Sequence, residues 1–160
     1  MIPTEKARDN VRGSVPMEGA TVMIVDDDPD VRNVIHFMLT NAGYRVVEAS
    51  DGEAALARIQ SSGPTEDIAT IICDLRMPNV NGADVIEHLR THHPTIPYLV
   101  LTADTDFLLN EILAKQGVCD YLIKPVPKEK LLNAVRVSVR LHELREKQSS
   151  TGGERQGSFV

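Results

Sequence analysis

Five short apolar stretches alternate with five segments of helical spacing along this chain of 160 residues. The apolar stretches are rich in Val, Ile and Leu, which is typical of strands buried on both faces of a parallel sheet. Strict alternation of strand and helix favours right-handed crossovers and three layers. We therefore expect an α/β fold with a doubly wound, five-stranded parallel sheet. Its strands are predicted at Thr21–Val25, Tyr44–Glu48, Ile68–Cys73, Tyr98–Leu101 and Asp120–Ile123.

The segments between the strands carry residues typical of helix ends. Gly43 follows the first apolar helical pattern as a stop, and Asp51 fits the cap that opens the second. We expect the third helix to end before Pro94, because the residue before a proline disfavours the helical conformation. A fourth helix is predicted between Leu108 and Gly117, and a fifth from about Lys128 to Lys147, with Pro127 at its start.

Both ends of the chain lack this periodicity. Residues 1–19 mix charge, Gly and Pro, and residues 148–160 are polar and rich in Ser and Gly. We interpret these ends as a flexible lead and a flexible tail or truncated linker, with one domain at residues 20–147.

Charge and hydropathy narrow the range of partners. A net charge of -6 disfavours nucleic-acid binding. No apolar run reaches the roughly 18 residues of a membrane span, and the start of the chain has no signal-peptide core. We predict a cytoplasmic protein whose partners are neither nucleic acids nor membranes. Its two cysteines, Cys73 and Cys119, lie in apolar stretches and are expected to be thiols in the core.

Polar or charged side chains follow four of the five predicted strands. In doubly wound folds the working site lies beyond the carboxyl ends of the strands, so these side chains should meet. Crowded carboxylates repel each other, and a divalent ion such as Mg²⁺ with its preference for oxygen ligands offsets that repulsion. One carboxylate can then attack a phosphoryl group, while an ammonium and a hydroxyl hold its oxygens. The residues concerned are Asp26-Asp27-Asp28, Asp74, Thr102 and Lys124.

These residues lie in motifs that resemble the receiver domains of bacterial two-component response regulators. The resemblance covers roughly residues 20 to 145, and it implies a flavodoxin-like (βα)5 fold with strand order 2-1-3-4-5. It also implies that a sensor histidine kinase or a histidine phosphotransfer protein donates the phosphoryl group, and that the surface around the fourth and fifth helices then changes. The motifs are Val22–Pro29, Asp74–Pro78 with Asn81-Gly82, Leu101–Ala103 and Tyr121–Pro125.

The resemblance assigns the chemistry residue by residue. Asp74 is the expected phosphorylation site, Asp27 a direct Mg²⁺ ligand, and Asp26 an acidic partner that binds the ion mainly through water. The backbone carbonyl of Arg76 would complete the protein's share of the ligands, and Lys124 would hold the phosphoryl group.

The resemblance also assigns residues to the conformational change that follows phosphorylation and to the lifetime of the phosphorylated form. Thr102 matches the hydroxyl that moves toward the phosphate, and Tyr121 matches the aromatic residue that then turns inward. The side chains of Arg76 and Asp104 would tune the rate of autodephosphorylation. Asp28 matches no ligand and is expected to be a solvated helix cap.

Two other functions remain open on the sequence alone. A phosphatase of the haloacid-dehalogenase type also places a nucleophilic Asp after its first strand, but Asp30 stands where that pattern has Thr or Val, and Pro125 follows Lys124 where an acidic pair belongs. A receiver-like module that only binds partners is the other alternative. If the chain is a receiver domain, we expect no enzymatic activity beyond its own phosphorylation and autodephosphorylation.

The predicted fifth helix carries two apolar stripes. We expect the sheet to bury the first, which consists of Leu132, Val135 and Val139. The second lies roughly opposite and suggests a surface for a partner or a homodimer seam, local packing under the tail, or a linker to another domain. Its residues are Val137, Leu141 and Leu144.

Overall fold

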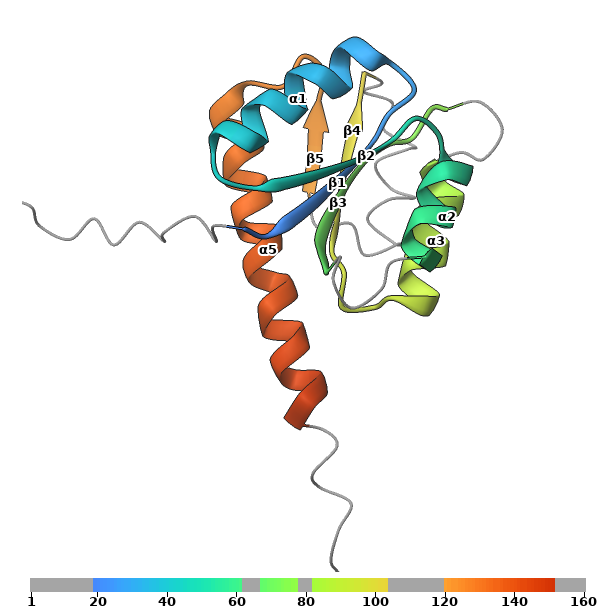
Figure 1. Cartoon of the computed structure of the whole chain (residues 1–160), viewed down its shortest axis with the longest axis vertical. Coiled ribbons are helices and arrows are strands. Elements are labelled where there is room, and N and C mark those ends of the chain that lie inside the picture. Colours follow the sequence, from blue (N-terminus) through green and yellow to red (C-terminus); the bar gives the residue numbers. More distant parts are fainter. Residues whose placement is uncertain (1–18, 62–66, 78–81, 104–119, 152–160) are drawn as a thin grey trace, which may run out of the picture.

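The computed structural model describes residues 19–61, 67–77, 82–103 and 120–151. In this part of the chain five parallel strands form one sheet in the order β2-β1-β3-β4-β5 (Figure 1). This confirms the predicted fold class and strand order. The strands are β1 (Thr21–Val25), β2 (Arg45–Ala49), β3 (Ile68–Asp74), β4 (Tyr98–Thr102) and β5 (Asp120–Ile123).

Helices cover both faces of the sheet. Buried side chains of α1 and α5 pack on one face and those of α2 and α3 on the other (Figure 1). The predicted fourth helix lies outside the described residues. Among the described residues, no helix combines the length and the hydrophobicity of a membrane span. The helices are α1 (Pro29–Asn41), α2 (Gly52–Ser61), α3 (Gly82–His92) and α5 (Lys128–Thr151).

The helix ends follow the predicted capping residues. The Asp28 carboxylate accepts a hydrogen bond from the Asp30 N–H at 2.9 Å and caps α1. Asp51 does the same for α2, accepting from the Ala54 N–H at 2.7 Å. Gly43 has a φ of 94°, a left-handed conformation that turns the chain from α1 into β2. Asp28 is exposed, as expected for a solvated cap.

The core consists of two apolar layers separated by the sheet. Successive residues of a strand point to opposite faces, so Met23 faces α2 and α3 whereas Ile24 faces α1 and α5. Cys73 is fully buried in the layer under α2 and α3, as predicted. Its burial raises the pKa of the thiol well above its ordinary value, and the charge of Asp74 adds to that effect. Cys119 lies outside the described residues.

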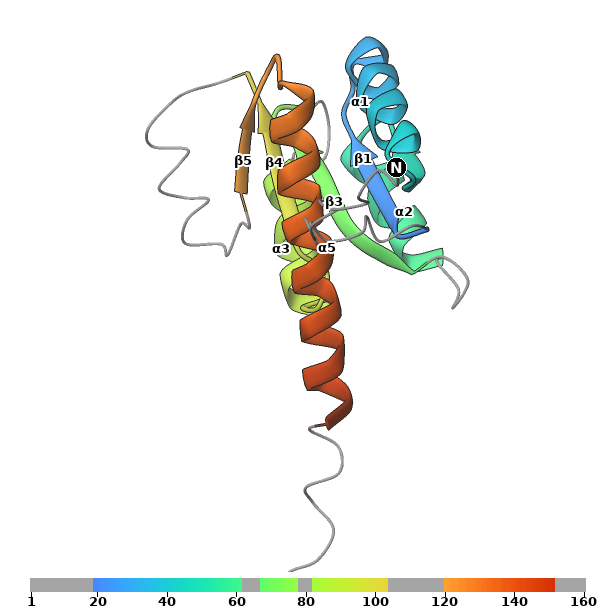
Figure 2. The same ribbon diagram turned by 90° about the vertical axis from the view of Figure 1, so that its left-hand side faces the viewer.

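Helix α5 differs from the sequence prediction in two respects. Leu131, not Leu132, is fully buried with Val135 and Val139, because the helix turns its i, i+4, i+8 positions toward the sheet. The helix also continues past the predicted end at Lys147 to Thr151, and its last turns project beyond the sheet (Figure 2). The hydroxyl of Thr151 donates to the Lys147 carbonyl at 3.0 Å, which contributes to this polar end. The predicted boundary at residue 148 therefore falls inside the helix.

A buried hydroxyl pair joins α5 to the sheet. The Oγ atoms of Thr70 on β3 and Ser138 on α5 lie 2.5 Å apart, and both residues are fully buried. Thr70 also donates to the Pro97 carbonyl at 3.0 Å, so Ser138 must donate to Thr70. A turn later, His142 Nδ1 lies 3.0 Å from the Thr95 carbonyl oxygen. These polar contacts fix where α5 lies along the sheet.

We expect Thr70→Val to destabilise the fold more than Ser138→Ala. The first change removes both bonds of the Thr70 hydroxyl and leaves the buried Ser138 hydroxyl without its partner, at a cost of about 1–3 kcal/mol, although the Pro97 carbonyl keeps the Ile71 N–H at 3.2 Å. The second leaves the Thr70 donor bonded to Pro97 and should cost about 0.5–1.5 kcal/mol. Urea denaturation measures both, with exposed Ser150→Ala as a control that stays within about 0.5 kcal/mol. Strictly additive effects in the double variant would show that the pair is not coupled.

Candidate functional site

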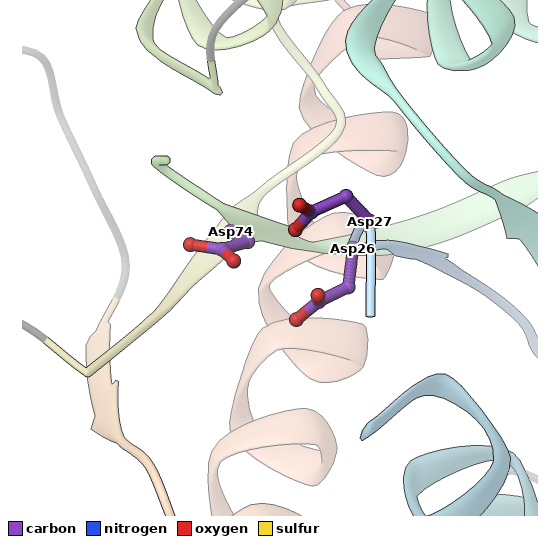
Figure 3. Close-up of side chains that lie close together, drawn as sticks. All are labelled: Asp26, Asp27 and Asp74. Atoms are coloured by element: carbon purple, nitrogen blue, oxygen red, sulfur yellow. The ribbon is translucent and has the colours of Figure 1, made fainter. Parts of the chain in front are cut away.

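Three carboxylates meet at the carboxyl ends of two neighbouring strands. Asp26 and Asp27 follow β1, and Asp74 is the last residue of β3. The parallel register pairs Val25 with Cys73, so the next residues of both strands emerge side by side. One carboxylate oxygen from each of the three lies within 4.8 Å of the others. Figure 3 shows Asp26 and Asp27 beside Asp74 at this edge of the sheet.

The three carboxylates differ in exposure. Asp26 is fully buried and Asp74 is 5% exposed, whereas Asp27 is exposed to solvent. Asp26 accepts a hydrogen bond from the Asp28 N–H at 2.9 Å through Oδ1. Burial is the main reason that the pKa of Asp26 is raised above its ordinary value, although Lys124 and the Asp28 N–H act in the opposite direction. The site therefore concentrates negative charge in a poorly solvated place.

Lys124, which follows β5, bridges two of these carboxylates. Its Nζ lies 2.8 Å from Asp26 Oδ2 and 2.9 Å from Asp74 Oδ2. Burial opposes the charged ammonium, but hydrogen bonds and attraction from Asp26 and Asp74 outweigh it and raise the pKa of Lys124 above its ordinary value. The backbone positions this side chain, since the Lys124 N–H donates to the Thr102 carbonyl at 2.9 Å.

An open pocket of about 340 Å³ gives access to Asp74. Thr102, the buried last residue of β4, lines it together with Lys124 and Arg76. The Arg76 N–H donates to Asp74 Oδ1 at 3.1 Å, while the Arg76 side chain is exposed. A reagent that enters this pocket meets a carboxylate, an ammonium and a hydroxyl at once.

Gly82 fixes the segment that carries Asp74. Its N–H donates to the Leu75 carbonyl at 3.1 Å. A Cβ at position 82 would overlap the Asp74 carbonyl oxygen and lie 2.7 Å from the Leu75 Cα. Only glycine therefore lets α3 begin this close to the end of β3.

The structure brings together six of the residues that the sequence singled out. Tyr121 is half-buried on β5 and packs against the core layer under α2 and α3. Asp104 lies outside the described residues. Sequence reasoning missed Arg32 on α1, whose Nη1 donates to the Asp26 carbonyl at 2.6 Å. Its only signal was its position six residues after Asp26. The six residues are Asp26, Asp27, Asp74, Arg76, Thr102 and Lys124.

A family model described as the response regulator receiver domain matches residues 22–136. The chain belongs to this family. The receiver domain is 32% identical over 130 residues to the transcriptional regulatory protein CpxR of Klebsiella pneumoniae. The aligned region covers 81% of this chain and 53% of that protein. It is also 32% identical over 114 residues to the transcriptional regulatory protein ZraR of Klebsiella oxytoca, covering 71% of this chain and 25% of that protein.

Solved structures support the same fold. The receiver domain superposes on chemotaxis protein CheY4 of Vibrio cholerae with a TM-score of 0.68 and 30% identity, covering 75% of this chain and 98% of that one. A response regulator receiver domain from Clostridium thermocellum gives 0.70 at 29% identity, with 78% of this chain and 98% of that one covered. By contrast, the chain spans about half or less of the curated relatives that it matches in sequence, here 53% of CpxR and 25% of ZraR.

The buried charge of Asp26 predicts a pH-dependent effect on stability. Without divalent ions, Asp26→Asn should raise the melting temperature at about pH 7, because the folded state holds a carboxylate whose pKa is raised from 3.8. A raised pKa means that the folded protein takes up the proton first as the pH falls. The native charge is then lost, and the gain should shrink toward about pH 3.

Thermal denaturation across this pH range measures the effect. Asp30→Asn is a matched control, since it removes an exposed carboxylate from the first turn of α1. A gain that is equal at both ends of the pH range would contradict burial of the Asp26 charge as its cause.

Proposed function

We propose that this receiver domain accepts a phosphoryl group on Asp74 in a Mg²⁺-dependent reaction. The observation that carries the proposal is the position of the Asp74 carboxylate, which lies between two further carboxylates and Lys124 and adjoins an open pocket. In that place a nucleophilic oxygen, an ammonium and a hydroxyl converge on one small volume. Such convergence is what transfer of a phosphoryl group to a carboxylate requires.

The donor set fits Mg²⁺. Hard carboxylate oxygens from Asp26, Asp27 and Asp74 gather within 4.8 Å, and exposed Asp27 gives an ion a route from solvent. We propose that the backbone carbonyl of Arg76 adds a further oxygen. When bound, Mg²⁺ neutralises charge that builds up on the phosphoryl oxygens during transfer.

Three residues of this chain have separate roles in the proposed phosphoryl transfer. A carboxylate oxygen of Asp74 forms a bond to phosphorus as the bond from phosphorus to the donor nitrogen breaks and the donor's imidazole leaves. Lys124 already lies 2.9 Å from Asp74 and is placed to hold one phosphoryl oxygen. The Thr102 hydroxyl, in the wall of the same pocket, would bond another. The chain thus catalyses its own phosphorylation and autodephosphorylation only.

The donor we propose is a sensor histidine kinase or a histidine phosphotransfer protein, in the cytoplasm. An apolar groove beside α1 supports a macromolecular donor, because Lys124 lines both this groove and the open pocket at Asp74. Its walls include Val34, which is 54% exposed, and Phe37 on the same helix is 68% exposed. A docked protein would cover these side chains while it presents a histidine to Asp74. A small phosphodonor needs no such surface.

Phosphorylation is proposed to alter the surface around the fourth and fifth helices. Thr102 would move toward the phosphoryl group and Tyr121 would turn inward behind it. We also propose that the side chains of Arg76 and Asp104 slow the approach of water to phosphorylated Asp74. The fourth helix and Asp104 lie outside the described residues. Its relatives in sequence include the DNA-binding response regulator MtrA of Mycolicibacterium smegmatis, but this chain covers 51% of that protein.

We expect Asp74→Asn to abolish labelling by acetyl phosphate and Mg²⁺ without unfolding the protein. An amide is a poor nucleophile, and its shape preserves the packing. Intact-mass spectrometry before and after base treatment measures the acyl phosphate, and circular dichroism measures the fold. Asp28→Asn is the matched control, because Asp28 caps α1 beside the site and should leave labelling unchanged. A Mg²⁺-dependent, base-labile phosphoryl group on Asp74→Asn would show that the acceptor is elsewhere.

The same reaction separates the alternatives. Turnover of a phosphorylated substrate without stable labelling would favour a phosphatase. An unlabelled wild-type protein would favour a module that only binds partners.

We also propose a homodimer through the second stripe of α5. Val137 is 62% exposed and Leu144 46% exposed, and half-buried Leu141 lies between them. If this stripe is the seam, Leu141→Glu should convert a dimer into a monomer, because it places a charge in an apolar interface. Sedimentation equilibrium with and without beryllofluoride measures the mass. Glu146→Lys changes the charge at an exposed position that the helical spacing places away from the stripe, and it should leave the dimer intact. A wild-type monomer under both conditions excludes the seam.

A further inference from the structure

Every polar group of Asp26 is held by a different partner. Its backbone N–H donates to the Ala49 carbonyl on β2 at 3.2 Å. One carboxylate oxygen accepts from the Asp28 N–H, and the other lies 2.8 Å from Lys124 Nζ. Its backbone carbonyl accepts from Arg32 Nη1 at 2.6 Å. The first three partners are β2, the cap residue of α1 and the lysine after β5, whereas the fourth is a side chain within α1.

The Arg32 contact occurs where the sheet can no longer satisfy the backbone. Strand β1 ends at Val25, so the Asp26 carbonyl lies just past the last paired residue. Asp26 is fully buried, and a buried carbonyl without a partner is costly. Arg32 lies in the first turn of α1, where its own N–H donates to the Asp28 carbonyl at 3.1 Å. Its half-buried side chain therefore reaches back over the Asp26–Asp28 turn.

This contact acts directly on a candidate Mg²⁺ ligand. The Asp26 carbonyl belongs to the planar peptide group that leads into Asp27. Fixing the direction of the carbonyl fixes the orientation of that plane, and hence the starting direction of the Asp27 side chain. Asp27 is exposed, and its carboxylate has no hydrogen-bond partner among the described residues. Its carboxylate depends on its backbone for its position.

We propose that Arg32 is a positioning residue for the divalent cation, because it holds the Asp26–Asp27 peptide so that the Asp27 carboxylate faces Asp74. The inference rests on the proposed function, since it concerns the ion that supports phosphorylation of Asp74. Arg32 itself binds neither the ion nor the phosphoryl group. Partners that orient metal ligands in this way typically account for about 10-fold to 100-fold in metal affinity.

The positive charge of Arg32 weakens Mg²⁺ binding, whereas its hydrogen bond to the Asp26 carbonyl strengthens it. A guanidinium beside the site repels a cation, so its removal through charge alone would tighten Mg²⁺ binding. Loss of peptide orientation would weaken it. The two effects differ in sign, and a binding measurement therefore separates them. The hydrogen bond from Arg32 is short and partly buried. Solvent and the carboxylates of Asp26 and Asp74 screen the repulsion between the guanidinium and the cation. We therefore expect the loss of orientation to dominate the change in Mg²⁺ affinity.

The test is the Mg²⁺ dissociation constant of the unphosphorylated protein, measured by isothermal titration calorimetry. Arg32→Met removes the donor and keeps the aliphatic stem, and the dissociation constant should rise about tenfold. Arg32→Lys keeps a charged donor on a long stem and should recover part of that loss. Arg140→Met, at an exposed position on α5, is the matched control and should bind Mg²⁺ like the wild type.

Unchanged or tighter Mg²⁺ binding in Arg32→Met would overturn the inference. A purely structural role for Arg32 would also overturn it. In that case Arg32→Met would lower the melting temperature and the rate of labelling at saturating Mg²⁺, but the dissociation constant for Mg²⁺ would stay unchanged. The proposed function fails in a different way: a wild-type protein that binds Mg²⁺ but gains no phosphoryl group on Asp74. Failure of the wild type to bind Mg²⁺ contradicts both proposals before any variant is compared.

Discussion

Repulsion among three carboxylates is the constraint around which this end of the molecule is built. Asp26, Asp27 and Asp74 have oxygens within 4.8 Å, and two of these side chains are almost entirely removed from water. Such an arrangement costs free energy unless positive charge and hydrogen-bond donors surround it. Lys124 supplies the charge from β5, and backbone N–H groups of Asp28 and Arg76 supply donors. A divalent cation offsets repulsion of this kind, which is the physical basis of the Mg²⁺ binding proposed above.

The fold makes the crowding unavoidable. Strands β1 and β3 are neighbours in the sheet although a complete strand and two helices separate them in the sequence. Their parallel pairing places both carboxyl ends at the same edge, so residues 26 and 74 meet without any contribution from loops. Two apolar layers hold the strands in that register from either face. Gly82 then keeps the end of β3 close to the start of α3. Precision at the site is thus a property of the core.

Much of this was predictable from the sequence. Buried strands produce apolar stretches, and a polar residue that interrupts each stretch at its end marks the site, as Asp74 and Thr102 do. The strand order was taken from the family resemblance, because periodicity carries no information about which strands are neighbours. The rotation of α5 was predicted one position out, since Leu131 and Leu132 are alike in hydropathy and only packing distinguishes them. Arg32 escaped notice for a related reason: its partner is a backbone carbonyl, which every residue has.

The length of α5 gives the contacts of Ser138 and His142 a mechanical meaning. The helix begins four residues after Lys124 and runs for 24 residues, about 36 Å, along and then past the sheet. Its buried hydroxyl contact at Ser138 lies near the middle, between the sheet edge that carries Asp74 and the projecting end, so a tilt of the helix would pivot there. From Ser138 to Thr151 is about 20 Å, so a tilt of about 5° moves the far end by about 1.7 Å. A stiff helix that pivots at Ser138 would turn a shift at Lys128, about 15 Å away, into a shift about a third larger and opposite in direction at Thr151.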